Sequence, residues 1–230
     1  PRTQAQISWD YNKGKPVGYW RFDEASGATC YDDSGNNNGT ATIGGTGTQA
    51  DIAAARANGA TGKFGKCMSF DGTDDYVSIA DNSILDTTTT FTFSAWVYNN
   101  NIAAEQMVFS NTDAAIGWHI EVYQSKLIIQ VYPGGAYAFS TTAMSSGVWQ
   151  HIAVTYNNGA VTYYLNGVAN GTGNYTYSAP TGLTKRIGLF FNNSYPWNGK
   201  IDDVRFYNYV RTADQIMQDY NQGMGAKLGE

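Results

Sequence analysis

Tyr19-Trp20-Arg21-Phe22-Asp23-Glu24, near the beginning of the chain, has a counterpart near its end in Gly199-Lys200-Ile201-Asp202-Asp203-Val204-Arg205-Phe206-Tyr207. Each stretch is an aromatic and aliphatic run with the length of a buried strand, yet each also carries acidic residues. A carboxylate that is buried without a partner is costly. We therefore expect the two strands to lie side by side, so that Asp23 and Asp202 meet and bind a cation.

The composition is typical of an all-β protein. The chain has 230 residues, enough to bury a sizeable core. Only 14% of the residues are charged, whereas 14% are aromatic and 26 are glycine. The net charge of −5 gives no basic surface for nucleic acid. No apolar run approaches the roughly 18 residues of a membrane-spanning helix, so we expect no insertion into a membrane.

Short apolar runs alternate with turn sequences from Val17 onward, as in antiparallel sheets. Hairpin turns are predicted at Asn157-Asn158-Gly159 and Gln124-Ser125. Thr212 and Gln215 form a capping box that begins one short helix, which we expect to pack across one end of the sandwich. The expected strands are 17–23, 67–70, 75–79, 91–99, 106–111, 117–123, 126–132, 136–140, 149–157, 160–165, 185–191 and 200–207. This pattern predicts a two-sheet antiparallel jelly-roll sandwich with one short C-terminal helix.

The chain divides into three parts by composition. Residues 1–16 have no clear core pattern and are interpreted as a linker or arm from a larger polypeptide. Residues 17–223 form the sandwich, with a Gly-, Ala- and Asn-rich excursion at 31–66 that is briefly helical at 50–57. Residues 224–230 are interpreted as a tail. The chain begins without a signal peptide, which suggests a mature chain or an excised domain.

Cys30 and Cys67 each follow a similar strand beginning, and we expect a disulfide between them. In the loop-entropy model, such a bridge contributes on the order of 4 kcal/mol. It would also indicate an oxidising compartment. The alternative interpretation is that both are small buried hydrophobic residues.

Six stretches occur along the chain in a characteristic order. They are Gly18-Tyr19-Trp20-Arg21-Phe22-Asp23-Glu24 and the stretches at 68–77, 91–97, 149–156, 164–167 and 201–207. Over roughly residues 16–223, this order resembles the laminin-G-like domains of the concanavalin A-like lectin and glucanase superfamily. The resemblance implies two curved antiparallel sheets with a concave and a convex face. It also implies a non-enzymatic binding or adhesion module within a larger secreted or cell-surface protein.

The resemblance also implies a structural Ca²⁺ where the first and last strands meet. Hard cations of this kind take six to eight oxygen ligands from carboxylates, amides, carbonyls and waters. Asp23, Asn36, Asn38 and Asp202 are the predicted ligands. The alternative is that the two aspartates cap turns or pair with neighbouring arginines.

Strand alternation predicts a polar and aromatic surface suited to carbohydrate. In the run 117–123, Trp118, Ile120 and Val122 share one face, which we assign to the core. The candidate ligand-binding residues on or beside the opposite surface are His119, Glu121, Tyr123, Gln130, Tyr132, Tyr137, Tyr195 and Trp197. The alternative is that tyrosine is an ordinary strand former on an exposed face that binds nothing.

Catalysis is not expected. Retaining glucanases need two carboxyl groups about 5 Å apart. The four glutamates, Glu24, Glu105, Glu121 and Glu230, show none of the close sequence spacing that would supply such a pair on one strand. We therefore predict an extracellular or cell-surface binding module, with glycan as the first candidate ligand. The alternatives are a protein-binding or structural module and, with less support, a glycosidase.

Overall fold

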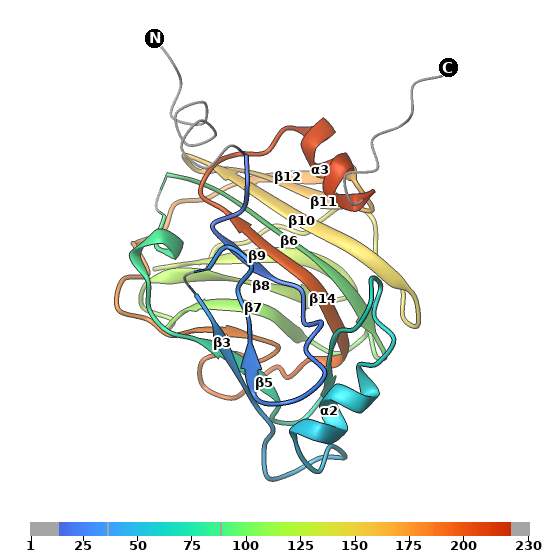
Figure 1. The fold of residues 1–230 in the computed structure, drawn as a ribbon. Helices are drawn as coiled ribbons and strands as arrows, with labels where there is room; N and C mark the ends of the chain where they lie inside the picture. Colours follow the sequence, from blue (N-terminus) through green and yellow to red (C-terminus); the bar gives the residue numbers. More distant parts are fainter. Residues whose placement is uncertain (1–13, 36, 88, 222–230) are drawn as a thin grey trace, which may run out of the picture.

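The first and last strands of the fold lie side by side, as the sequence predicts. In the computed structural model, which describes residues 14–35, 37–87 and 89–221, β1 (Gly18–Trp20) pairs antiparallel with β14 (Asn198–Tyr207). Tyr19 lies opposite Arg205 in this pairing. Figure 1 shows the two strands together although they come from opposite ends of the sequence.

One of two seven-stranded antiparallel sheets, here called sheet A, is built around β14. One side of β14 pairs with β6, and the other side pairs with β1 and β4. The sheet then continues through the outer hairpin strands to β12. The remaining members of sheet A are β4 (Met68–Asp71), β6 (Thr90–Asn99), β10 (Trp149–Asn157), β11 (Ala160–Leu165) and β12 (Val168–Asn174).

The second sheet, here called sheet B, also has seven strands. Its strand order is β2-β3-β5-β13-β7-β8-β9. The strands are β2 (Thr29–Cys30), β3 (Gly39–Thr42), β5 (Tyr76–Ile79), β13 (Lys185–Ile187), β7 (Gln106–Thr112), β8 (Gly117–Tyr123) and β9 (Lys126–Tyr132). The predicted all-β sandwich is therefore confirmed.

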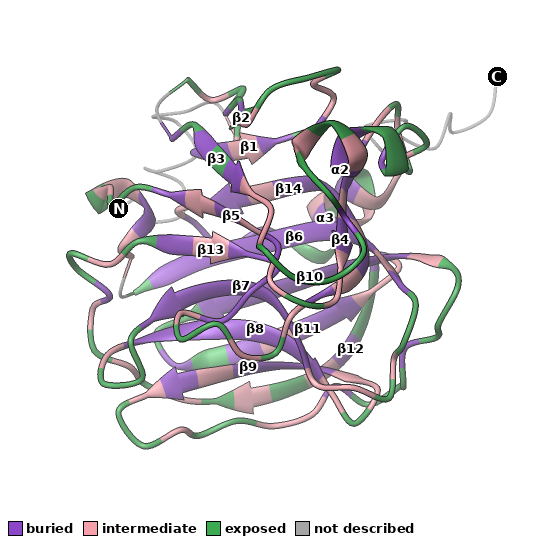
Figure 2. Ribbon diagram, turned by 90° about the horizontal axis from the view of Figure 1, so that it is seen from below, coloured by how far each residue is buried: buried purple, intermediate pink, exposed green. Residues whose placement is uncertain are grey.

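Aromatic side chains fill the space between the sheets. Phe91 of sheet A stacks on Trp118 of sheet B with ring centroids 4.5 Å apart, and Phe206 lies 5.6 Å from Phe91. All three side chains are fully buried. Figure 2 shows that most of β6 and β8 is coloured as buried. Burial of each such side chain contributes roughly 1.5–3 kcal/mol, so this cluster is a major part of the core.

Both predicted hairpin turns are present. Gln124 and Ser125 connect β8 to β9 with φ values of +50° and +62°. Asn158 and Gly159 connect β10 to β11 with φ values of +48° and +100°. Two consecutive residues with positive φ are the signature of the type I′ turn, whose twist matches that of the flanking strands.

The C-terminal helix α3 (Ala213–Tyr220) begins with the predicted capping box of Thr212 and Gln215. It lies on the outer face of sheet A, where Ile216 packs against Ala153 and Tyr164. The expected position across one end of the sandwich was therefore wrong. The apolar side of the helix needs a flat apolar surface to cover, which the sheet supplies and an edge does not.

Two further helical elements are α2 (Ile52–Asn58), which overlaps the helical stretch expected at 50–57, and the short 3₁₀ helix η1 (Ser83–Leu85). None of the helices in the described part of the chain has the length and apolar character needed to cross a membrane.

Candidate functional site

The centre of the outer face of sheet A is covered and offers little room for a ligand. Trp96 of β6 stacks on Tyr220 of α3 at 5.3 Å and meets the edge of Phe64 at 5.6 Å. Only 2% of Trp96 is exposed as a result. The candidate ligand surface is therefore the outer face of sheet B, where the sequence predicts it.

Strand β8 divides its side chains between the core and this outer face as predicted. Trp118, Ile120 and Val122 are fully buried in the core between the sheets. His119 and Glu121 point the other way, but they too are buried, with 2% exposure each. They therefore form the floor of the site, beneath other side chains.

A carboxyl pair lies at the centre of this floor. Glu105, immediately before β7, lies close enough to Glu121 for the two carboxyl groups to interact. Burial, then the charge of Glu121 and its contact with the Glu105 side chain, raise the pKa of Glu105 to about 7. Glu105 therefore keeps its proton to a higher pH than an ordinary glutamate, because a second negative charge beside Glu121 is unfavourable.

The buried polar atoms of this floor lack donors. Within the described part of the chain, Oε2 of Glu121 receives no hydrogen bond from an N–H or O–H group. The Nε2 atom of His119 lies 3.5 Å from Oε1 of Glu121, and neither ring nitrogen of His119 has a hydrogen-bond partner there. Buried groups of this kind are costly unless something completes their hydrogen bonds.

Aromatic side chains surround the carboxyl pair on one side. Phe190 meets His119 edge-on at 4.9 Å, Tyr132 lies 5.8 Å from His119, and Tyr195 lies 5.8 Å from Phe190. Burial and then the charge of Glu121 raise the pKa of Tyr132. The charge of Glu105 is the main cause of the raised pKa of Tyr195. Both phenols therefore lie within the field of the carboxyl pair.

A second aromatic group continues the surface along the same edge of sheet B. Tyr123 stacks on Phe139 at 5.8 Å, and Tyr137 meets both rings edge-on at 6.2 and 5.6 Å. Tyr137 is 41% exposed. Gln130 donates a 3.2 Å hydrogen bond from its Nε2 to the Tyr132 hydroxyl. Seven of the eight predicted ligand-binding residues thus gather on or beside the outer face of sheet B.

Trp197 is the exception, and its prediction as a ligand-binding residue on or beside this surface was wrong. It is fully buried in the core, because its backbone N–H bonds to the carbonyl of Gly188 at the entry to β14 and its ring turns inward.

Glu105 was missed by sequence reasoning. It lies two residues before Met107, which is opposite Glu121 in the β7–β8 pairing, and the sequence alone does not reveal that register.

The predicted calcium ligands are brought together only in part. Asp23 accepts a 2.9 Å hydrogen bond from the Lys66 amide, and Asp202 accepts a 3.0 Å bond from the Phe64 amide. Both therefore hold the same loop. Asn38 instead accepts a hydrogen bond from the Asp32 amide. Asn36 lies outside the described residues.

Among the predicted calcium ligands, Asp202 has a strongly raised pKa. It is 1% exposed. Burial is the main cause that raises its pKa to about 7, and the charges of Asp203 and Asp23 add to the effect. Asp23 and Asp202 thus bind one loop from two ends of the chain, and the charge of Asp23 opposes the ionisation of Asp202, a cost that a cation would lower.

Another acidic group, Asp71, Asp74 and Asp75, has carboxylate oxygens within 4.8 Å of one another. Asp71 accepts hydrogen bonds from the amides of Thr48 and Gln49, and Asp74 accepts one from the Thr46 amide. These contacts attach the loop before α2 to the end of β4. The group thus has a structural role as an anchor for that loop.

The expected disulfide is not present. Cys30 and Cys67 are free thiols in separate buried surroundings. The Sγ atom of Cys30 lies 3.3 Å from Nη2 of Arg56, whereas Sγ of Cys67 lies 3.5 Å from the Gly59 carbonyl. Burial raises the pKa of the Cys30 thiol to about 11 and that of Cys67 to about 12. The alternative interpretation, two small buried hydrophobic residues, fits these surroundings.

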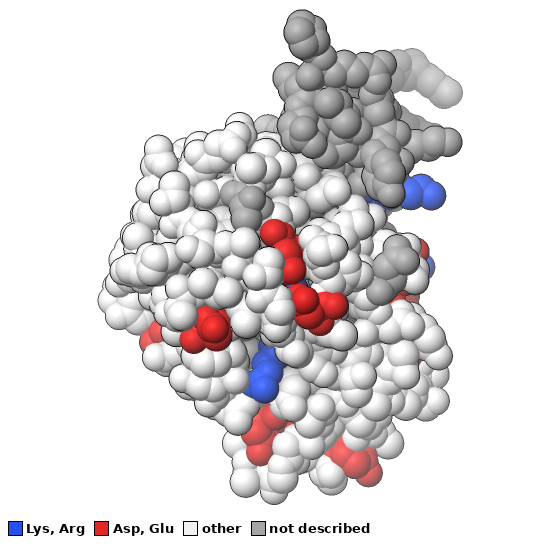
Figure 3. All heavy atoms as spheres, turned by 90° about the vertical axis from the view of Figure 1, so that its left-hand side faces the viewer, with Lys and Arg blue, Asp and Glu red and all other residues white. Residues whose placement is uncertain are grey.

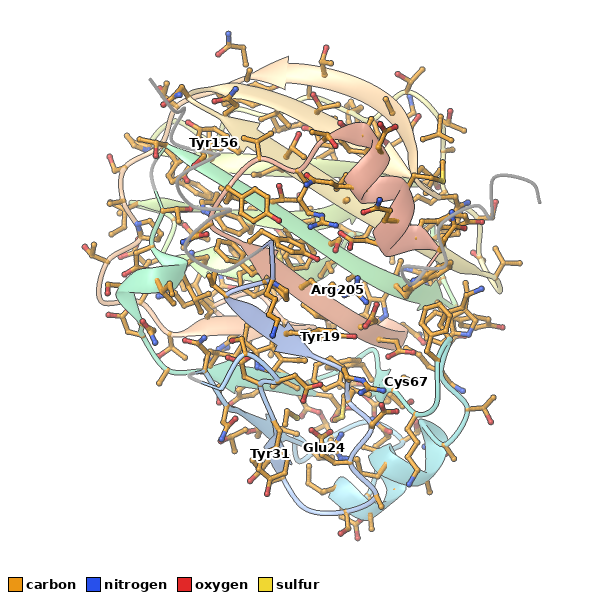
Figure 4. All side chains as sticks on the ribbon, turned by 45° about the horizontal axis from the view of Figure 1, so that its top comes forward. Tyr19, Glu24, Tyr31, Cys67, Tyr156 and Arg205 are labelled. Carbon is orange, nitrogen blue, oxygen red and sulfur yellow. The ribbon has the colours of Figure 1, made fainter. Side chains whose placement is uncertain are left out.

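A surface cavity of about 520 Å³ lies elsewhere, between the loop 25–27 and α2. Arg56 in its wall is already paired with Glu24 at 3.1 Å (Glu24 is labelled in Figure 4). None of the described residues that line it is aromatic. It lacks the flat apolar rings that sheet B presents, so it is the weaker candidate.

The fold has close relatives of known structure. Domain 4 of AbnA, a GH43 extracellular arabinanase from Geobacillus stearothermophilus solved in complex with arabinotriose, is 22% identical, with a TM-score of 0.68 over 90% of this chain and 98% of that domain. The binding domain of Paraclostridial Mosquitocidal Protein 1 is 16% identical, with a TM-score of 0.67. Botulinum neurotoxin type C, whose cell entry depends on interaction with two ganglioside molecules, is 14% identical, with a TM-score of 0.62.

The likeness to the two toxins covers 93% and 96% of this chain but only 53% of each toxin chain. No curated protein matches the sequence. The sequence pattern of one family, described as the concanavalin A-like lectin/glucanases superfamily, matches residues 71–217. These residues include most of both sheets and the whole carboxyl pair. The chain therefore belongs to the concanavalin A-like lectin/glucanases superfamily.

Proposed function

We propose that this protein is a non-catalytic glycan-binding module of a larger extracellular protein, and that it binds through the outer face of sheet B. The observation that carries the proposal is the buried Glu121 carboxyl, which has an oxygen without a donor beneath a group of aromatic rings. Sugars match such a surface because they offer hydroxyl donors together with apolar C–H faces.

Each part of the surface has a separate role. The rings of Tyr137 and Tyr195, exposed by 41% and 38%, can stack against the C–H face of a sugar ring. Glu105 and Gln130 are partly exposed beside them and can bond hydroxyl groups. The carboxyl accepts from a hydroxyl with a charge-assisted hydrogen bond, which is about twice as strong as a neutral one.

Two structural relatives give independent support. One is an arabinanase domain solved with arabinotriose, and another is a neurotoxin that interacts with gangliosides. Arabinotriose is a saccharide, and a ganglioside carries a saccharide headgroup. Sequence identities of 22% and 14% show a shared fold but not a shared ligand. The ligand class proposed here therefore rests on the residues of sheet B.

The spacing of the carboxyl pair favours binding over glycoside hydrolysis. The acid and the nucleophile of a retaining glycosidase lie about 5–5.5 Å apart, and those of an inverting enzyme lie farther apart. The contact between the Glu105 and Glu121 side chains that contributes to the raised pKa of Glu105 supports a spacing shorter than either arrangement requires.

A structural Ca²⁺ is the second part of the proposal. Asp23 and Asp202 are the residues that would hold it, together with backbone carbonyls of the loop 61–66. The bound ion would supply positive charge between two strands that are far apart in the sequence. The raised pKa of Asp202, to which the charge of Asp23 contributes, supports this arrangement.

The glycan proposal is tested by affinity electrophoresis against immobilised neutral polysaccharides, followed by calorimetry with oligosaccharides of the best binder. Tyr195→Ala and Tyr132→Ala should each weaken binding at least tenfold, since stacking area is lost. Tyr31→Ala is the matched control, because Tyr31 is 58% exposed beside β2 at the opposite edge of sheet B (Figure 4). Unchanged binding in both site variants would exclude this surface.

A protein ligand is the alternative, because an exposed aromatic face also suits protein interfaces. The same variants separate the two classes. If no saccharide binds and a protein partner loses affinity in Tyr195→Ala, the face is a protein-binding surface and the glycan proposal is wrong.

A further inference from the structure

The carboxyl pair of sheet B has no lysine or arginine partner in the described part of the chain. Two basic side chains of the same sheet are engaged elsewhere. Lys126 lies with its Nζ 5.8 Å from the centroid of the Phe139 ring. Arg186 lies over Tyr76 and donates to Asn193. Figure 3 shows another face of the molecule, where most side chains carry no charge.

The titratable groups that face Glu105 and Glu121 are one histidine and two phenols. His119 is on β8 with Glu121, Tyr132 is on β9, and Tyr195 is on the loop before β14. None of these groups supplies a permanent positive charge. The charge of Glu121 acts on Glu105, Tyr132 and Tyr195, so the pair is a centre of negative charge that aromatic rings partly cover.

An ammonium group would satisfy three features of this site at once. Its positive charge would offset the pair, and its N–H groups would supply donors that the buried carboxyl oxygens lack. The rings of Tyr132 and Tyr195 would add cation–π attraction, which strengthens when the cation loses water. A carboxylated sugar would meet repulsion from Glu105 and Glu121 instead.

We propose that the preferred ligand of this surface is a saccharide with a free amino group, a de-N-acetylated amino sugar, whose ammonium contacts Glu105 above Glu121. Saccharides that carry carboxylates are disfavoured. The proposal rests on the glycan-binding function and specifies its ligand class. It follows from the charge and burial of the pair, not from the ligands of the structural relatives.

The test compares three β-1,4-linked tetrasaccharides that differ only at C2 of each ring. These are the oligomers of glucosamine, N-acetylglucosamine and glucose, titrated by calorimetry at pH 6.5 and low salt. We expect the glucosamine oligomer to bind at least tenfold more tightly than either neutral oligomer. The preference should decrease as salt is added, because the attraction is electrostatic.

Glu105→Gln keeps the shape of the side chain and removes its ionisation. It should reduce the preference for the glucosamine oligomer over the glucose oligomer to less than threefold. Glu121→Gln is the second variant and should have the same effect if it folds. Asp214→Asn is the matched control, since it removes one exposed carboxylate far from the site, on α3.

The outcomes are distinguishable. Equal affinity for the three oligomers would overturn this inference and leave the glycan-binding function standing. If neither these oligomers nor any other saccharide bound, both this inference and the glycan-binding function would be overturned. A lysine-rich peptide that binds as tightly as the glucosamine oligomer and loses affinity in Glu105→Gln would show that the ammonium belongs to a protein, which also overturns the inference.

Discussion

The hydroxyl of Tyr19 donates a 2.5 Å hydrogen bond to Oδ1 of Asp203, a residue 184 positions later in the chain. Asp203 also pairs with Arg205 at 2.8 Å, and Arg205 reaches Asp219 of α3 at 2.9 Å. Figure 4 shows Tyr19 and Arg205 together between the first and last strands. The acidic residues in the last strand thus connect β1, β14 and α3.

Breaking this network should destabilise the whole fold. Tyr19→Phe removes the hydrogen bond that the hydroxyl donates to Asp203 and the 3.2 Å bond that it accepts from Arg205, and should lower the free energy of unfolding by about 2 kcal/mol. Asp203→Ala leaves Arg205 buried with only one acidic partner and should cost about 3 kcal/mol or more. Urea denaturation measures both changes. As a control, Arg21→Ala breaks a pair whose arginine is 53% exposed and should cost less than about 1 kcal/mol.

Glu105 should make stability depend on pH in the direction opposite to a typical acidic residue. Its pKa is about 7 in the folded chain, above its ordinary value of 4.5. Between these two values the folded state binds more protons than the unfolded state, so stability falls as pH rises. In thermal unfolding from pH 5 to pH 8, Glu105→Gln should flatten this decline. If the thermal midpoint fell equally steeply with pH in both proteins, the raised pKa of Glu105 would be contradicted.

Calcium should stabilise the wild-type protein through Asp202. Millimolar Ca²⁺ should raise the thermal midpoint, because a ligand that binds only the folded state adds RT ln(1 + [L]/Kd) to its stability. Asp202→Asn should abolish the rise, whereas Asn38→Ala should retain it. Heat from a calcium titration is the second measurement. If the wild-type protein showed no heat of binding and no shift of the thermal midpoint, the calcium site would be excluded.

The two cysteines should behave as buried thiols. A thiol reagent such as Ellman's reagent should label neither Cys30 nor Cys67 in the native protein, since both are almost fully buried and burial raises their pKa values. In denaturant without reductant, both should react. If neither reacted after unfolding, a disulfide would join them and the free-thiol assignment would be wrong.

The sequence predicted those parts of the fold that leave a periodic apolar pattern. Strands β6 to β11 alternate or run apolar between clear turns, and all were expected. β12 was missed because Val168–Asn174 carries two glycines and two asparagines, and its pairing with β11 is what holds it in the sheet. β3 (Gly39–Thr42) lies in the Gly-rich excursion and was missed for the same reason.

The candidate site was predictable where it follows strand alternation and not where it depends on loops. His119, Glu121 and Tyr123 follow from the period of β8 alone. Glu105 reaches Glu121 only through the pairing of β7 with β8, which contains a register shift at Met107. Long-range pairing of this kind leaves no local mark in the sequence.

The position of β14 has a consequence for biosynthesis. Because β14 lies between β6 on one side and β1 with β4 on the other, ribosome-bound chains that end before residue 198 have no template on which sheet A can close. The edges of β6 and β1 then stay open until nearly the whole chain has been translated. Sheet A of this sandwich can therefore close only after β14 has been synthesised, and the unpaired strand edges are exposed to aggregation until then.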